Sequence, residues 1–475
     1  MSDTVEGRWA EIFGPRYVTV TLILCLGVAL FAFNAFLSNT ALPTAVEELE
    51  GVAVISWATT LYLVFAIVGG AGAALLKQRL GSRTALLASS AVFLAGSLLA
   101  ANASTMTEVL IGRAVQGLGE GVVAAVCFAL IPELFPSRLV PKVFGMQAVV
   151  WAVAAFGGPA GAGLLTELVS WRAAFLINVP LVLIFGIMVA LVVPARSGPV
   201  VTGLGFPGIR LTAIGGGIML VALAGISSAG VAGALLAGAA VLLTAAVVID
   251  RRSRERLMPP GAFWPDTVVG SGLWMVLLMP IAGATSAVYL VLLLQQLWGY
   301  GPTLAGVVGA VMAVAWSLSA VTVANVKRRS TRKLLIRTGP VLVAAGLLGV
   351  LAGLEWTSLP LLIIAQIAIG AGFGISNGYL NLTLMESAPD GERDRTSALL
   401  PTTQSAGNAI GTALAGLAAN SVGFAAATTR EDMLVAIVPV FVLGAAAAGL
   451  ALLAALRTTA LVPRAGAVEA GFAAE

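Results

Sequence analysis

Long apolar stretches dominate this sequence and restrict what it can fold into. A helix that crosses a membrane needs about 20 mostly apolar residues. Of the 475 residues, 59% are hydrophobic and only 10% are charged, whereas soluble domains carry about a quarter charged residues. With so few charges the chain must present apolar side chains to lipid. We find fourteen candidate spans, at 17–44, 54–76, 84–103, 106–134, 140–168, 172–194, 209–228, 230–250, 264–297, 303–326, 334–354, 358–386, 396–421 and 431–457.

Basic residues in the connecting loops indicate the orientation. If the N-terminus lies in the cytoplasm and the spans alternate, 23 of the 26 Lys and Arg residues fall on the cytoplasmic side. Only Arg172 and Arg430 fall outside, and Arg113 lies within a span. Cytoplasmic loops are enriched in Lys and Arg, so we expect an even number of spans and two cytoplasmic termini. The abundance of Ala, Gly and Arg favours a bacterial source, and hence a multi-pass protein of the inner membrane.

Two landmarks occur once in each half of the chain, at nearly the same spacing. The basic segment 77–83 resembles 327–332, and 133–136 resembles 386–389. A duplication of this kind places a substrate site near the membrane midplane, between the halves. We therefore predict an all-α fold with 14 transmembrane helices: two six-helix bundles, within 1–200 and 257–475, joined by a two-helix linker within 201–256.

The composition argues against several classes of function. The chain has no His, and its two Cys residues lie inside apolar runs, so neither a metal site nor a disulfide framework is indicated. We find no ATP-binding domain, no cluster of catalytic groups and no basic footprint for nucleic acid. A transporter without cofactor or metal, working as a monomer in the bilayer, is the expectation. A membrane sensor would call for an appended soluble domain.

Two ionisable residues lie deep in a predicted span. Arg113 and Glu120 are seven residues apart, on one face of a helix and about 10 Å apart along its axis. Charges at the bilayer centre are costly and mark functional positions. Glu120 lies between Gly119 and Gly121 and is the candidate proton carrier, with a purely structural hydrogen-bonding role as the alternative. Arg113 is assigned to proton coupling or, equally, to holding helices together.

Polar and aromatic side chains within the spans are candidates for the wall of a substrate cavity. Amide and aromatic groups of this kind orient and enclose amphipathic ligands. Some of the aromatic residues are expected to be interfacial anchors instead. The candidates are Asn34, Gln147, Trp151, Tyr289, Gln295, Asn377, Asn381, Gln404 and Asn408.

Four stretches resemble motifs of the major facilitator superfamily, in its fourteen-spanner drug:proton antiporter branch. Residues 110–119 resemble the fourth-helix motif with its buried Arg, and 158–163 the fifth-helix antiporter motif. Residues 171–180 resemble the start of the sixth helix, and 34–43 the first-helix motif. The resemblance implies a conformational role for Gly157, Gly158, Pro159 and Gly163, where the fifth helix bends. It also implies a cytoplasmic gating loop with Arg79, Gly81 and Arg83.

Two positions depart from the family pattern. Asn34 and Gln78 stand where Asp is usual. The first Asp is implicated in proton handling, so Glu120 is expected to take over that role. The second helps to lock the halves together by charge, so the resemblance implies a weaker lock here.

These observations favour a secondary active transporter, namely a proton-coupled exporter of hydrophobic or amphipathic small molecules. The alternative within transport is a dedicated exporter or flippase for one lipid-like or secondary metabolite. A non-transporting membrane sensor is the third hypothesis.

Overall fold

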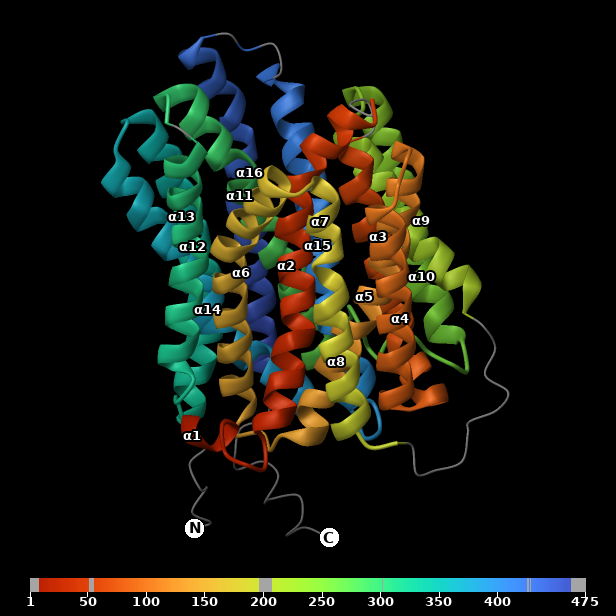
Figure 1. Cartoon of the computed structure of the whole chain (residues 1–475). Coiled ribbons are helices and arrows are strands. Elements are labelled where there is room, and N and C mark those ends of the chain that lie inside the picture. Colours follow the sequence, from red (N-terminus) through yellow and green to blue (C-terminus); the bar gives the residue numbers. More distant parts are fainter. Residues whose placement is uncertain are drawn as a thin grey trace.

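The computed structural model describes residues 8–50, 55–195, 207–300, 302–424, 427 and 429–462. Helices are the only regular elements in this part of the chain. They are α1 (Trp9–Ile12), α2 (Val18–Glu48), α3 (Ile55–Leu80), α4 (Ser82–Ala101), α5 (Met106–Leu134), α6 (Val140–Leu168), α7 (Trp171–Leu176), α8 (Asn178–Val192), α9 (Gly208–Gly225), α10 (Ala229–Arg252), α11 (Val268–Trp298), α12 (Pro302–Val323), α13 (Arg329–Glu355), α14 (Leu359–Glu386), α15 (Arg393–Ser421) and α16 (Arg430–Leu461). Figure 1 shows them as a bundle of roughly upright helices.

Helices occupy every segment that the hydropathy pattern singles out. Among the described residues, eleven helical segments are long and apolar enough to cross a membrane, and Val18–Asn34 and Val140–Ala155 are shorter apolar stretches. The predicted span 172–194 is divided between α7 and α8, which meet at Ile177. Helix α6 runs through the Gly157–Pro159 stretch, so the expected bend does not interrupt the helix.

The basic loops gather at one end of the bundle, called here the basic end. Lys77 at the end of α3 pairs with Asp394 at the start of α15, and Arg79 lies 3.9 Å from Glu255 in the loop after α10. Lys142, at the start of α6, reaches the carbonyl of Ala324 at 3.4 Å. The two basic residues assigned to the other side, Arg172 and Arg430, contact residues at the opposite end. The basic residues named here therefore lie at the two ends to which the alternation assigns them.

Two sets of helices pack around a central space. Within the N-terminal half (α2–α8), α3 and α4 pack on α5, and α2 packs on α6; within the C-terminal half (α11–α16), α13 packs on α14 and α11 on α15 and α16. The halves meet where α15 contacts α3 and α5 and where α6 contacts α12 and α14. Small residues allow close packing of membrane helices, and a Cβ at Gly117 of α5 would lie 2.1 Å from the carbonyl oxygen of Tyr62 on α3.

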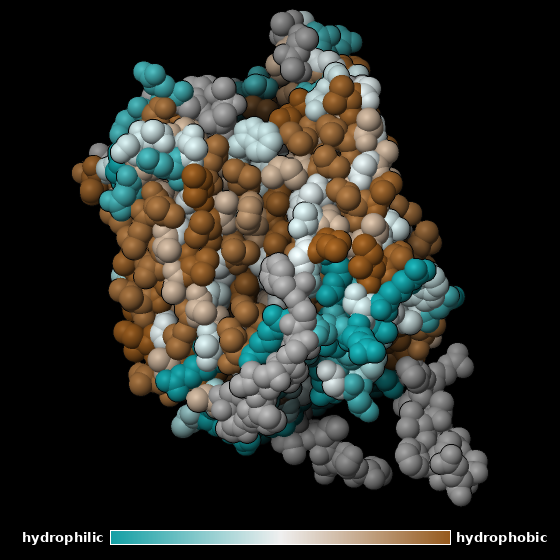
Figure 2. All heavy atoms as spheres, turned by 90° about the vertical axis from the view of Figure 1, so that its right-hand side faces the viewer, coloured by the Kyte–Doolittle hydropathy of each residue, from teal (hydrophilic) through white to brown (hydrophobic). Residues whose placement is uncertain are grey.

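Helices α9 and α10 pair with each other at one side of the molecule, on the right in Figure 1. Helix α9 contacts α3 of the N-terminal half and α15 of the C-terminal half. The face on this side is mainly hydrophobic above, and hydrophilic side chains gather toward its lower part (Figure 2). The pair thus touches both halves without separating them.

The repeated sequence landmarks occupy equivalent places. Arg83 lies in the first turn of α4 and Arg332 in the first turn of α13, while Glu133 and Glu386 lie at the ends of α5 and α14. Gly81 joins α3 to α4 with a φ of 80°, a left-handed conformation that favours glycine. The tight turn in the predicted gating loop therefore depends on this residue.

Candidate functional site

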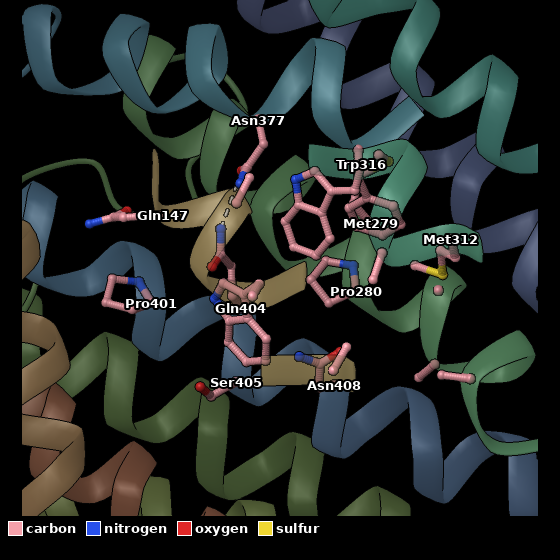
Figure 3. Close-up of a pocket in the computed structure, with 18 of the residues that line it drawn as sticks. Gln147, Met279, Pro280, Met312, Trp316, Asn377, Pro401, Gln404, Ser405 and Asn408 are labelled. Carbon is pink, nitrogen blue, oxygen red and sulfur yellow. Dashed lines mark hydrogen bonds between the residues drawn. The ribbon is translucent and has the colours of Figure 1, made fainter. Parts of the chain in front are cut away.

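A cavity of about 560 Å³ lies between the two halves. Helices α2, α3, α5 and α6 supply one wall, and α11, α12, α14 and α15 supply the other. No described residue of α9 or α10 lines this cavity. Figure 3 shows side chains from both halves directed into the same space. A cavity of this size accommodates a drug-sized molecule.

The wall of the cavity is apolar, with a few uncharged polar groups. Six aromatic side chains and three methionines are among the lining residues, and adaptable Met side chains suit binding of varied ligands. Gln404 donates to the side-chain oxygen of Asn377 at 3.3 Å (Figure 3), and Ser286 donates to Gln366 at 3.1 Å. None of the described lining residues is Asp, Glu, Lys or Arg. The cavity therefore offers hydrogen bonds to a ligand but no opposite charge.

Five of the nine predicted cavity residues line this space: Gln147, Trp151, Asn377, Gln404 and Asn408. The other four do not. Tyr289 packs edge-on against Phe424, and Asn381 is buried behind Asn377, to which it donates at 3.4 Å. Gln295 lies half-buried near the end of α11 and outside the lining, and Asn34 belongs to the cluster around Glu120.

The halves are closed at the basic end. The Lys77 ammonium is 2.7 Å from both Glu133 at the end of α5 and Asp394 of α15, and its side chain is only 6% exposed. Arg395 donates to Gln78 at 3.3 Å across the same seam. Lys77 therefore makes a charged contact between the halves beside the position that lacks the usual Asp, and the weaker lock stays a prediction.

The predicted antiporter motif lies toward the opposite end of α6. Gly157 faces the ring of Phe33 on α2, and a Cβ built on Gly163 would meet no atom within 4 Å. Gly158 is buried, while the side chain of Pro159 lies outside those that the structure describes. In this conformation Gly157 and Gly163 are not in close contact with the C-terminal half.

Glu120 lies in a buried polar cluster inside the N-terminal half. It is 1% exposed, and its Oε2 accepts hydrogen bonds from the Tyr62 hydroxyl at 2.8 Å and from the Asn34 amide at 3.0 Å. Asn178 of α8 donates in turn to Asn34 at 3.3 Å. The other carboxylate oxygen of Glu120, Oε1, has no hydrogen-bond partner among the described residues. The carboxyl group thus has one oxygen held by two donors and one available for a proton.

Arg113 and Glu120 are connected through Tyr62. The Arg113 guanidinium lies over the Tyr62 ring, 4.1 Å from its centroid, and donates to Gln116 at 2.8 Å. Gln116 donates to Ser97 of α4 at 2.8 Å. Cation–π contacts of this kind are strengthened when both groups are desolvated. Arg113 therefore joins α3, α4 and α5 while it contacts the same tyrosine as the acid.

Phe31 lies between this cluster and the cavity. Its ring stacks on Tyr62 at 6.4 Å and meets Trp151 edge-on at 5.6 Å, and both Phe31 and Trp151 line the cavity. Glu120 itself does not line it, although the next residue, Gly121, does. The acid is therefore one aromatic layer behind the wall. Sequence reasoning missed both Tyr62 and Phe31, which sit among apolar neighbours without a motif.

The cavity between two halves and the buried Arg on α5 prompt comparison with known transporters. The profile of the Major Facilitator Superfamily matches residues 24–412. The chain belongs to this superfamily. It is therefore a membrane transporter and not an enzyme.

Curated relatives of the family extend along most of the chain. A Mycobacterium tuberculosis protein described as a probable multidrug-efflux transporter is 31% identical over 439 residues, which is 89% of this chain and 92% of that protein. The multidrug transporter protein MdtP of Bacillus subtilis is 26% identical and covers 79% of this chain and 70% of its own length.

Solved structures share the fold at low sequence identity. The human organic anion transporter MFSD10 superposes with a TM-score of 0.66 at 14% identity, covering 94% of this chain and 100% of its own. The proton:xylose symporter XylE gives a TM-score of 0.65 at 16% identity, covering 94% and 96%.

Proposed function

We propose that this transporter is a proton-coupled exporter of uncharged hydrophobic or amphipathic small molecules. The observation that carries the proposal is the large cavity, in whose wall no described residue is ionisable, with one buried carboxylic acid just behind it. The mycobacterial and Bacillus relatives, described as multidrug transporters, support export of varied compounds. Binding in such a cavity rests on apolar contact and on amides such as Gln147 and Gln404.

The proposed arrangement in the membrane is that of the fourteen-spanner branch of the family. Two six-helix bundles move against each other, the α9–α10 pair is a peripheral linker, and the protein works as a monomer. The basic end faces the cytoplasm of a bacterial inner membrane, so both termini are cytoplasmic. The loop charges support this orientation, and the absence of described α9 and α10 residues from the cavity wall supports the linker role. The cavity then opens away from the cytoplasm in the present conformation.

Proton coupling is assigned to Glu120. When it is ionised, the hydrogen bond from Tyr62 is charge-assisted, and such bonds are about twice as strong as neutral ones. A proton taken up on the unpartnered Oε1 weakens this bond and frees Tyr62 to move. Because Phe31 stacks on Tyr62 and forms the cavity wall, the change is transmitted to the substrate through one ring. Arg113, on the face of the same tyrosine, is positioned to compensate the negative charge.

Transport by purified protein in liposomes with an imposed pH gradient tests this proposal. Glu120→Gln keeps the shape and the acceptor oxygen but cannot release a proton. It should bind a neutral fluorescent lipophile normally and lose gradient-driven accumulation. Glu108→Gln is the matched control, because Glu108 lies on the same helix at its exposed first turn. Accumulation by Glu120→Gln at the parent rate would refute the proton role.

The substrate class is tested with a pair of probes that share one ring system. One probe is neutral, and the other carries a permanent quaternary ammonium group. The neutral probe should be transported at least about tenfold better, since a cation would enter a cavity without a compensating charge. Preference for the cation would contradict the assignment while leaving the coupling experiment intact.

A further inference from the structure

A second pocket lies at the basic end, outside the region between the halves. It has a volume of about 300 Å³ and is formed by the end of α10 and the loop that leads to α11. Its wall combines Arg251 and Arg256 with Val247, Met258 and Trp264. The pocket shares no described lining residue and no lining helix with the transport cavity, so it has no part in the proposed transport step.

The charge of the pocket is positive. Neither Arg251 nor Arg256 forms an ion pair with a carboxylate of the described residues. Asp250 is the one acid among the described wall residues, and its carboxylate is already paired with Arg210, which lies 2.6 Å from Oδ1. The backbone amide of Leu257 also donates to Oδ1 at 2.7 Å, and that of Met258 donates to Oδ2 at 2.9 Å. Arg251 donates one hydrogen bond to the carbonyl oxygen of Ala262 at 3.3 Å, so its other guanidinium donors, together with those of Arg256, remain for one anion.

The pocket adjoins a lipid-facing surface. Val241 and Val248 on α10 are 67% and 42% exposed, and their spacing places them on one helix face that continues to Arg251. Trp264, half exposed, stacks under the Arg251 guanidinium at 4.3 Å. Tryptophan at the end of a span is typical of the membrane–water interface. In Figure 2, hydrophilic side chains gather below the hydrophobic surface on this side of the molecule.

We propose that this pocket binds the headgroup of an anionic phospholipid. The phosphate is held by Arg251 and Arg256, and the acyl chains lie along the Val241–Val248 face of α10. Basic pockets beside transmembrane helices on the cytoplasmic side suit anionic headgroups. The apolar face favours a lipid over free phosphate, because a soluble anion makes no use of it.

Native mass spectrometry of the full-length protein with added phosphatidylglycerol or phosphatidylcholine tests the site. The double variant Arg251→Gln/Arg256→Gln should bind phosphatidylglycerol about 10- to 30-fold more weakly, as expected for two arginines near an anionic headgroup. The matched control is Arg252→Gln/Arg254→Gln, which removes the same charge from exposed side chains outside the pocket. The control should bind within about threefold of the parent.

Three results would overturn the proposal: equal loss in both double variants, equal binding of phosphatidylcholine, or displacement of the lipid by millimolar inorganic phosphate. The last result would identify a site for a soluble anion. The single variant Arg256→Gln separates loss of binding from misfolding. Arg256 forms no hydrogen bond or ion pair with the described residues, so its replacement should leave the fold intact while weakening the binding of phosphatidylglycerol. Unchanged binding by this variant would also count against the site.

Discussion

The contact between α3 and α5 gives a prediction that tests packing and coupling together. A methyl group at Gly117 would lie 2.1 Å from the carbonyl oxygen of Tyr62. Gly117→Ala must therefore force the two helices apart by about 1 Å, and overpacking of this kind costs about 1–3 kcal/mol. The displaced residue is Tyr62, whose hydroxyl is 2.8 Å from Glu120. We expect a lower melting temperature together with weaker proton-driven transport.

The assay uses the native thiol of Cys127, which is fully buried. Because the second free thiol, Cys25, is only partly buried, it is replaced by Ser in every variant. The reaction of Cys127 with a thiol-sensitive dye during heating then reports unfolding, and liposome transport is measured in parallel. Gly449→Ala in α16 is the control, because a Cβ there meets nothing within 4 Å. Alanine is also the better helix former by about 1 kcal/mol, so the control should melt no earlier than the parent. If Gly117→Ala melts and transports like the control, the helices are not in the close contact described.

Two further predictions concern the opening and closing of the halves. Lys77→Ala removes the charged contact to Asp394, so a cysteine placed at Asn377 should be labelled about fivefold faster from the basic side, as expected for a partly exposed ion pair worth about 1 kcal/mol. Lys77→Arg should label at nearly the parent rate, and an unchanged rate in Lys77→Ala would show that the pair does not hold the seam. Gly163→Leu fits the open space at the other end, so it should melt like the parent but transport poorly, because the halves must close there later in the cycle. Full transport by Gly163→Leu would mean that this stretch never approaches the other half.

Hydropathy and loop charge predicted the helices well, because both signals are local. The candidate spans fall on helices, with 172–194 divided between α7 and α8, and the basic loops that the structure describes share one end of the bundle. The break at Ile177 within the 172–194 span was not predicted, because hydropathy does not reveal a short interruption of the helix within a continuous apolar run. The spacing of Arg113 and Glu120 along one helix was also readable, and both are buried as expected.

The site could be predicted only in part, because which face of a helix meets which neighbour depends on packing between distant segments. Tyr289 and Asn377 look alike in sequence, as polar residues inside apolar spans. Only the second lies in the cavity wall, since the position of Tyr289 is set by Phe424. Tyr62 joins Arg113 to Glu120 from a different helix. No sequence pattern within α5 predicts a partner on another helix.

The uncharged cavity wall has a consequence for the energy source. An exporter that exchanges one proton for a neutral molecule moves one net positive charge across the membrane in every cycle. The membrane voltage then contributes about 2.3 kcal/mol per 100 mV for each charge moved, in addition to the pH difference. A transporter that exchanges one proton for one monovalent cation moves no net charge, so the membrane voltage would not drive it. Because no described residue of the cavity wall is an acid that could bind a cation, the proposed exporter would be electrogenic, and it would continue to export at neutral external pH while the membrane potential persists.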